Sequence, residues 1–292
     1  MSLPSEPVDA AVLRSWGLPS PGRTKQSRGD AVIVGASRRT PGAVVLGFEA
    51  ALRVGAGRVA VLVPGSVEHQ LGVPLPEAAV YPLPDDPAEP IAGAAADALA
   101  HADAVLVGPG FDDVPQTRAT LRAVAHVGPR RLVLDAYGLA VLPDFERALL
   151  PAQLVLTPNE DELRMLTSPR PHGADQKRMA VDVARRFDAV VASYAVVATP
   201  SGALFDIAGG GPGLATAGSG DVLAGAITGF LARGIDIDRA AVWGLWAHAR
   251  AGDRLTETHG LGFLARELAA EIAYAVHEVD GLGSSSGGDG PS

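Results

Sequence analysis

The residues best suited to chemistry in this chain form one small-residue loop that leads into an apolar helix: Gly213-Leu214-Ala215-Thr216-Ala217-Gly218-Ser219-Gly220-Asp221-Val222-Leu223-Ala224-Gly225. Such a loop exposes backbone N–H groups at a helix N-terminus, where unpaired donors and the helix dipole favour an anion. Gly218 and Gly220 let the backbone bend and approach a ligand closely. Asp221 would repel a phosphate, so its carboxylate is better explained as a base that acts on a group approaching the phosphorus. The alternative is that Ser219 and Asp221 only cap the helix.

Four other loops that carry glycine or polar residues follow apolar runs of the chain. They occupy residues 35–43, 108–112, 135–138 and 157–163. Each is consistent with an ordinary turn or helix start, and each could also contact a ligand. Asp135 follows a buried run directly, where a carboxylate needs a partner or a ligand. The alternative is that Asp135 caps the short helix that follows. Thr157 or Asn159 is expected to cap the helix that follows, and the acidic residues of its first turn suit the dipole.

Elements that alternate between strand and helix position these loops. Short aliphatic runs predict strands at 31–34, 58–63, 104–107, 131–134, 153–156 and 189–191, and a hairpin at the sheet edge is predicted from 195–198 and 203–206. Helices are predicted at 42–54, 89–100, 115–126, 174–187, 221–232, 238–256 and 264–277. This order predicts an α/β fold, a mostly parallel central sheet with helices on both faces. Ligands of such sheets bind at the carboxyl ends of the strands.

The chain divides into three parts by composition. Residues 1–29 are rich in Pro, Ser and Arg without a clear period, and they are expected to form an N-terminal arm. Residues 30–279 hold the alternating pattern, and residues 280–292 are expected to be a disordered tail.

Bulk composition excludes several classes of protein. Of the 292 residues, 47% are hydrophobic and 20% are charged, which fits a globular protein. The net charge of −9 disfavours nucleic acid and anionic membranes as partners. No run of about 20 apolar residues predicts a membrane span, and no secretion signal is visible, so a cytoplasmic location is expected. Without cysteine there is no disulfide or thiolate site. His248 is expected to pack on its helix, not to bind a metal, and no metal ligands are predicted.

Taken together, these residues resemble the ADP/ATP-dependent NAD(P)H-hydrate dehydratases, a family of ribokinase-like fold. The similarity spans about residues 29–277, and its strongest element is Gly211-Pro212-Gly213-Leu214-Ala215-Thr216-Ala217-Gly218-Ser219-Gly220-Asp221-Val222-Leu223. Supporting matches are Gly42-Ala43 through Gly55-Ala56-Gly57, then Gly108-Pro109-Gly110, Asp135-Ala136 and Thr157-Pro158-Asn159.

The resemblance implies a repair reaction on NADH or NADPH that has been hydrated at the nicotinamide ring. ADP, or ATP, would drive the dehydration of the S epimer, with AMP and phosphate released from ADP, and Mg²⁺ would accompany the phosphates. Asp221 would be the catalytic base. Contacts to the hydrated cofactor are implied for Ala43, Gly110, Asn159 and Asp221. Contacts to the nucleotide are implied for Ala192, Ser193, Ala217, Gly218, Ser219 and Gly220. The resemblance also implies a homo-oligomer, with a tetramer as one form.

The chain departs from the family pattern in two places. Family members usually carry Lys-Gly after the strand that here ends Val190-Val191, whereas this chain has Ala192-Ser193-Tyr194 and only Lys25 and Lys177 elsewhere. Arg38 or Arg39 is one candidate replacement. At the second place, Asn159 stands where histidine is usual. Two alternatives therefore stay open: a small-molecule kinase of the same fold, and a nucleotide-binding protein without catalysis.

Overall fold

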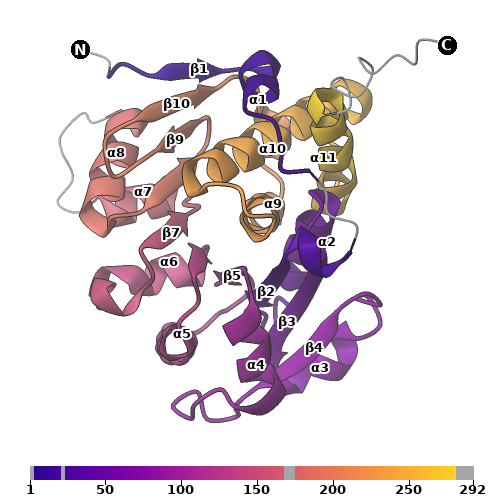
Figure 1. Cartoon of the computed structure of the whole chain (residues 1–292), viewed down its shortest axis with the longest axis vertical. Helices are drawn as coiled ribbons and strands as arrows, with labels where there is room; N and C mark the ends of the chain where they lie inside the picture. The colour runs from indigo at the N-terminus through magenta and orange to yellow at the C-terminus, as the bar shows by residue number, and fades with distance from the viewer. Residues whose placement is uncertain (1–2, 21–23, 168–174, 281–292) are drawn as a thin grey trace, which may run out of the picture.

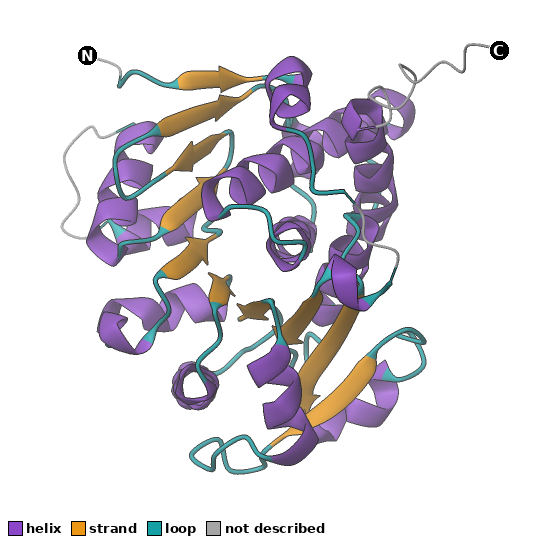
Figure 2. Ribbon diagram, in the orientation of Figure 1, coloured by secondary structure: helices purple, strands orange, loops and turns teal. Residues whose placement is uncertain are grey.

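In the computed structural model, residues 3–20, 24–167 and 175–280 are described, and their strands form one ten-stranded sheet (Figures 1 and 2). The sheet order is β1-β10-β9-β8-β7-β6-β5-β2-β3-β4. The strands are β1 Glu6–Val8, β2 Asp30–Val34, β3 Arg58–Pro64, β4 Ala79–Leu83, β5 Ala104–Val107, β6 Arg131–Leu134, β7 Gln153–Leu156, β8 Val190–Ser193, β9 Val196–Ala198 and β10 Leu204–Ile207.

Helices connect these strands and complete the C-terminal part of the fold. The α-helices are α1 Ala10–Trp16, α2 Ala43–Arg53, α3 Gly65–Leu71, α4 Gly93–His101, α5 Val114–Val127, α6 Tyr137–Val141, α7 Glu160–Leu166, α8 Gln176–Phe187, α9 Ser219–Ala232, α10 Ile237–His259 and α11 Ala265–Asp280. The short 3₁₀ turns are η1 Gln26–Arg28, η2 Leu142–Asp144, η3 Arg147–Leu149 and η4 Pro212–Leu214. No helix among the described residues is long and apolar enough to span a bilayer.

The predicted α/β architecture with helices on both faces is confirmed. Neighbouring strands are parallel except where β9 pairs with β8 and β10. Successive residues of a strand point to opposite faces, so Ile33 joins the core under α2, α9, α10 and α11, while Val32 and Val34 join the core under α4, α5, α7 and α8. Two separate hydrophobic cores therefore hold the sheet between helical layers.

A close crossing of two helices fixes the position of α9. A Cβ atom added at Gly225 of α9 would overlap the carbonyl oxygen of Gly47 in α2, so only glycine allows this approach. Phe230 of α9 and Trp243 of α10 pack with their ring centroids 5.9 Å apart, so these two aromatic rings lie in the interface between the two helices. Helix α9 is thus packed against both α2 and α10.

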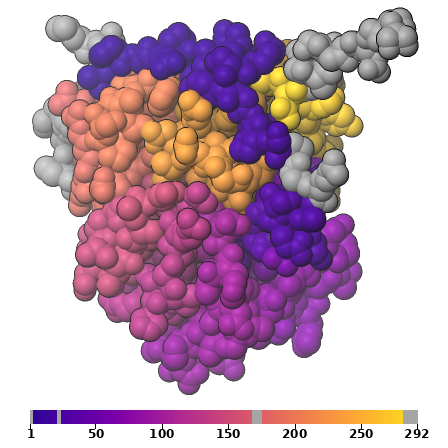
Figure 3. Space-filling view, viewed as in Figure 1, coloured from indigo at the N-terminus to yellow at the C-terminus, as the bar shows by residue number. Residues whose placement is uncertain are grey.

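The predicted hairpin is confirmed, but its place at the sheet edge is wrong. β9 and β10 pair antiparallel, yet β1 of the N-terminal arm adds to β10 in parallel and takes the edge. Lys177 of α8 binds Asp206 of β10 at 2.5 Å and Ser5 at 3.0 Å, while Trp16 packs edge-on against Phe205. Figure 3 shows this arm lying against the C-terminal half of the chain.

Sequence reasoning also missed β4 and α3, which follow β3 at the opposite edge. β4 contains Pro82, which a strand tolerates at a sheet edge, and its side chains are mostly half-exposed. Neither element has a strong apolar period. At the C-terminus, α11 extends to Asp280, so the predicted tail begins one residue later at the earliest, and residues 281–292 lie outside the described part of the chain.

Candidate functional site

The carboxyl ends of β2, β5, β6, β7 and β8 lie side by side, as the parallel pairings of these strands require. We call the loops that follow them, together with the segment that enters α9, the carboxyl rim. The chain runs outward in one direction from β2 through β3 to β4, and in the other from β5 to β8. The order of the strands therefore reverses between β2 and β5, where sheets of this type bind ligands.

Two rim loops are joined at this reversal. The N–H of Ala36 donates to Pro109 O at 2.8 Å, and the hydroxyl of Thr40 donates to Gly110 O at 2.7 Å. Gly110 has a φ of 74°, and a Cβ added there would lie 2.5 Å from Thr40 O and 3.0 Å from the Cβ of Ala43. The structure therefore brings Gly110 and Ala43, two predicted substrate contacts, against each other.

The segment that enters α9 lies next to the first turn of α2. A Cβ at Gly218 would overlap the side chain of Leu46 and would lie 3.7 Å from the Asp221 carboxylate. Gly218 is the N-cap of α9, with a φ of 88° that favours glycine, and no side chain caps this helix. The alternative that Ser219 or Asp221 serves only as a cap is therefore wrong. Gly220 faces open space, because a Cβ added there would meet no atom within 4 Å.

Three carboxyl groups gather behind this segment. Burial, followed by the negative charges of Asp221 and Glu162, raises the pKa of Asp135 to about 8. Burial, followed by the charge of Glu162, raises the pKa of Asp221 to about 7. Burial also raises the pKa of Glu162. Near neutral pH, Asp135 is thus mostly protonated, while Asp221 exists in both forms, as a general base working at that pH should.

Asp135 is held by its neighbour on the next strand. The hydroxyl of Thr157 donates to its Oδ1 at 2.8 Å, and both side chains are about 5% exposed. The Asp135 side chain does not cap α6, whose N-cap is Ala136 with no side-chain cap bond. The alternative interpretation of Asp135 as a helix cap is therefore not supported.

The loop after β7 contributes Asn159 and a residue that sequence reasoning missed. Asn159 caps α7 as predicted, because its Oδ1 accepts from the N–H of Glu162 at 3.0 Å and the Glu162 carboxylate accepts from the N–H of Asn159 at 2.9 Å. This reciprocal capping box turns Glu162 toward the carboxylate cluster. The sequence pattern Asn-x-x-Glu is typical of a capping box, and it could have identified Glu162 as a residue held at the start of α7.

The two residues predicted to contact the nucleotide at the end of β8, Ala192 and Ser193, have inward-facing side chains. Ala192 and Ser193 belong to β8 and are 0% and 1% exposed, and the hydroxyl of Ser193 donates to Pro158 O at 2.7 Å. Tyr194 follows with a φ of 55° and is 55% exposed, and its hydroxyl donates to Glu160 at 3.1 Å. At this position only Tyr194 presents a large side chain to solvent.

Of the described residues, neither of the two lysines nor the candidate arginines Arg38 and Arg39 takes the place of the missing lysine at the β8 end of the rim. Lys177 is bound to Asp206, and Lys25 lies beside the start of β3, where its carbonyl approaches Gly57. Arg38 and Arg39 follow β2, which is separated from β8 by β7, β6 and β5. At a strand spacing of about 4.8 Å this is about 19 Å, longer than an arginine side chain. Replacement by these arginines is therefore not supported.

Among the described residues, no group of three or more His, Cys, Asp or Glu side chains could hold a metal ion unaided. Mg²⁺ is usually bound by one or two carboxylates together with substrate phosphates and water. Glu162 and Asp135 offer the oxygen donors that this ion prefers, and a cation would favour their charged forms, whose pKa values are raised by burial first and by neighbouring negative charge second. The donor set thus fits Mg²⁺ arriving with a nucleotide.

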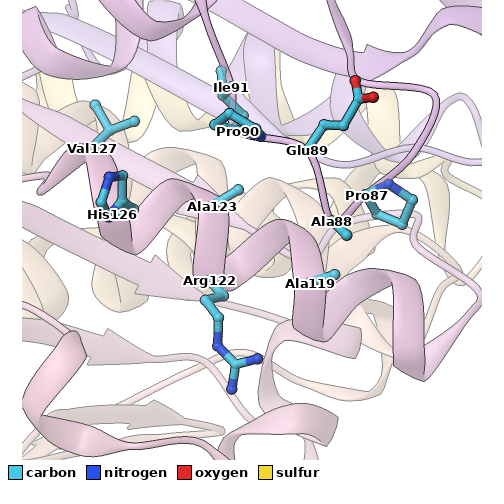
Figure 4. Close-up of a pocket in the computed structure, with 10 residues that line it drawn as sticks. All are labelled: Pro87, Ala88, Glu89, Pro90, Ile91, Ala119, Arg122, Ala123, His126 and Val127. Atoms are coloured by element: carbon cyan, nitrogen blue, oxygen red, sulfur yellow. The ribbon is translucent and has the colours of Figure 1, made fainter.

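A cavity of about 340 Å³ lies elsewhere, between the loop before α4 and the side of α5 (Figure 4). Its lining is mostly apolar, with Glu89, Arg122 and His126 as the polar exceptions. It contains none of the predicted site residues, so it is not part of the carboxyl rim.

Known proteins resemble the chain over nearly its full length. A family model described as NAD(P)H-hydrate dehydratase matches residues 31–274. An ADP-dependent (S)-NAD(P)H-hydrate dehydratase of Xanthomonas campestris is 40% identical over 274 residues, which cover 91% of this chain and 94% of that protein. The chain spans about half the length of the bifunctional NAD(P)H-hydrate repair enzymes that it also matches.

Solved structures share the fold at low sequence identity. A ribokinase-like superfamily protein of Enterococcus faecalis superposes with a TM-score of 0.80 at 22% identity, covering 94% of this chain and 96% of the other. An ADP/ATP-dependent NAD(P)H-hydrate dehydratase of Bacillus subtilis, co-crystallized with ATP and Mg²⁺, gives a TM-score of 0.78 at 23% identity, covering 95% and 100%. The predicted ribokinase-like fold is confirmed.

Proposed function

The chain belongs to the NAD(P)H-hydrate dehydratase family, and on this premise we propose that it catalyses the ADP-dependent dehydration of the S form of hydrated NADH or NADPH. The observation that carries the proposal is the pairing of an uncapped helix start with a base tuned to neutral pH. The first turn of α9 has no side-chain cap, and burial and Glu162 raise the pKa of Asp221 in the same turn to about 7.

The reaction needs a leaving group better than hydroxide. In the proposed first step, the ring hydroxyl attacks the terminal phosphorus of ADP, the bond between the two phosphates breaks, AMP leaves, and Asp221 accepts the hydroxyl proton. In the second step, the C–O bond of the phosphorylated ring breaks, phosphate leaves with the bonding electrons, and loss of a ring proton restores the double bond of NAD(P)H. Phosphorylation thus converts a poor leaving group into a good one.

The rim residues have separate roles in this proposal. The backbone N–H groups of residues 217, 218, 220 and 221 hold the phosphoryl oxygens, where oriented donors stabilise the charge that develops during transfer. The N–H of Ser219 is not among them, since it donates to Thr216 O at 3.2 Å. Ala43, Gly110 and Asn159 line the place for the hydrated ring, because two of them meet at the reversal of the strand order and the third begins α7. Ser193 contributes only backbone atoms, since its hydroxyl is used by Pro158. Ala192 likewise has no polar side chain to offer.

Mg²⁺ enters the proposal as a companion of the nucleotide. Glu162 and Asp135 would hold it, and the ion would neutralise phosphate charge at the rim. The Bacillus subtilis relative was co-crystallized with ATP and Mg²⁺. We propose ADP, not ATP, for this chain because the Xanthomonas campestris relative is named as ADP-dependent.

The test is a repair assay with the purified chain. Hydrated NADH, Mg²⁺ and either ADP or ATP are mixed with the protein, and NADH absorbance, AMP and phosphate are followed. The proposal requires NADH, AMP and phosphate in equal amounts with ADP and only with the S epimer. A stable phosphorylated product with no NADH would select the small-molecule kinase instead.

A second candidate, nucleotide binding without catalysis, is favoured by one observation. No lysine side chain of the described residues lies at the β8 end of the rim, where Ser193 is buried and Tyr194 is exposed. Calorimetric binding of ADP without any turnover by either nucleotide would select this role.

We further propose that residues 30–279 are the catalytic unit, that residues 1–29 are an arm attached to it, and that the protein acts in the cytoplasm as a homo-oligomer. The pairing of β1 with β10 supports an arm that belongs to the same sheet. Sedimentation velocity tests the oligomer, with a tetramer as the expected species.

A further inference from the structure

One buried histidine contacts the start of α9 from behind. His248 of α10 is 5% exposed, and its Nε2 lies 3.0 Å from both the hydroxyl oxygen and the carbonyl oxygen of Ser219. Ser219 is the first residue of α9 and is 5% exposed itself. Helices α9 and α10 are packed side by side (Figure 1).

The partners of His248 define its tautomer. A carbonyl oxygen can only accept, so Nε2 must carry a hydrogen to bond with Ser219 O. Burial lowers the pKa of His248 to about 4, so the ring is neutral at physiological pH. The Nε2–H group therefore donates to Ser219 O; in the opposite tautomer the Ser219 hydroxyl could still donate to Nε2, but the carbonyl oxygen would face a second acceptor.

This contact has a consequence for the N–H groups of α9. Serine hydroxyls near a helix start commonly accept from these groups and so satisfy them. Here the hydroxyl of Ser219 is turned to His248, and no side chain caps the helix. The first-turn donors at Gly220 and Asp221 are thus left for a ligand, on the side where Gly220 faces open space.

The same helix also holds the other end of the loop. Asp253, five residues after His248, accepts from the N–H groups of Gly210 and Gly211 at 3.0 and 3.2 Å. Between these anchors, Gly252 packs against Leu214, where a larger residue would overlap. Helix α10 therefore holds both ends of the segment 210–219 in place.

We propose that His248 is a positioning residue for phosphoryl transfer: its Nε2–H fixes Ser219 so that the first-turn N–H groups of α9 point at the phosphate. This inference rests on the proposed function of the loop. It assigns His248 no contact with substrate, because the group acts through Ser219. It differs from a packing role in requiring a hydrogen-bond donor at that place, not merely a side chain that fills the space.

The test compares three variants by calorimetric ADP affinity and by steady-state kinetics. His248→Leu fills the space without a donor, His248→Gln restores an N–H donor, and Val242→Ala is a control for lost stability, since Val242 is buried on the same helix six residues before. We expect His248→Leu to lower kcat about 100-fold and to raise the Kd for ADP about tenfold, since small misplacements of transferring groups carry such losses. His248→Gln should recover at least about tenfold of kcat, and Val242→Ala should change the melting temperature alone.

The outcomes separate this inference from the proposed function. A His248→Leu variant with the wild-type Kd and kcat overturns the positioning role while the proposed function stands. The positioning role is also overturned if His248→Gln has as low a kcat and as high a Kd for ADP as His248→Leu, or if Val242→Ala shows the same changes in kcat and Kd. If His248→Leu fails to fold, His248→Asn, whose shorter amide does not reach Ser219, takes its place. If the wild-type chain binds ADP without turnover, the Kd values alone decide. A wild-type chain that binds no ADP refutes both proposals.

Discussion

Replacement of Glu162 by glutamine isolates the charge that tunes the proposed base. The capping box of α7 uses the Glu162 carboxylate only as an acceptor for the N–H of Asn159. Glutamine keeps an oxygen for this bond and is itself found in such boxes. The change therefore removes a negative charge near Asp221 while the helix start is preserved.

The structure limits the size of the effect. The pKa of Asp221 is raised from its ordinary 3.8 to about 7, and burial is the larger of the two causes, with Glu162 second. The charge of Glu162 therefore supplies less than half of the difference, which is at most about 1.5 pH units. Without it, we expect the pKa of Asp221 to fall below about 7 but to stay well above its ordinary value, because burial remains.

The assay is the pH dependence of kcat/KM, which reports ionisation of the free enzyme. Because the base must be deprotonated, the wild-type rate should rise with pH through about 7. In Glu162→Gln the midpoint of this rise should move to lower pH. Mg²⁺ is supplied with the nucleotide at one fixed concentration for all variants. Asp161→Asn is the matched control, since this neighbouring carboxylate is 94% exposed and is not among the causes acting on Asp221.

Two results would refute the reasoning. An unchanged midpoint in Glu162→Gln would mean that Glu162 does not act on the base. A wild-type midpoint near pH 4 would mean that burial does not raise the pKa of Asp221, and the neutral-pH base would be lost from the mechanism.

Three other predictions concern the base, the loop and the arm. Asp221→Asn should abolish turnover and retain ADP binding. In the unfolded chain Asp221 ionises near pH 3.8, whereas in the fold it stays protonated up to about pH 7, so stability should fall from about pH 4 to about pH 7 and then level off. The variant should be up to about 4 kcal/mol more stable at pH 8 but not at pH 4, as thermal melts at both pH values would reveal. In Gly220→Ala the added methyl meets open space, so the melting temperature should stay unchanged while ADP binding weakens. Gly225→Ala should instead lower the free energy of unfolding by about 3 kcal/mol, because its methyl overlaps Gly47. Full ADP affinity in Gly220→Ala would remove Gly220 from the site. Lys177→Met should release the arm at β10 and speed its limited proteolysis without loss of kcat, and unchanged cleavage would show that β1 is held by its backbone pairing alone.

Local patterns predicted most of the fold correctly. The runs at 31–34 and 104–107 became buried parallel strands, because a strand covered on both faces is apolar at every position, and the run at 153–156 did so from Leu154 onward. Edge elements escaped prediction, since β1 and β4 are strands only through pairing with β10 and β3. Their sequences, with Pro7 and Pro82, carry little preference of their own.

The candidate site also has features that could be predicted from local sequence and features that could not. The segment entering α9 and the cap at Asn159 could be read directly, because small residues and caps act within a few positions of the chain. The buried environment of Asp221 and the role of Glu162 could not, since they depend on residues about 60 positions apart meeting at one rim. The inward orientation of Ser193 likewise depends on the carbonyl of Pro158 in the neighbouring loop.

The amino-acid order alone thus determined the layered α/β architecture, the small-residue segment that enters α9 and the presence of an acid in the first turn of that helix. Tertiary structure alone decided that burial raises the pKa of this acid to about 7, that His248 bonds to Ser219, and that the hydroxyl of Ser193 turns inward to Pro158. Backbone preference and apolar periodicity depend on residues that are close together in the sequence, so they can be predicted from it. Charge, burial and hydrogen bonding between distant segments exist only once the strands are ordered in the sheet.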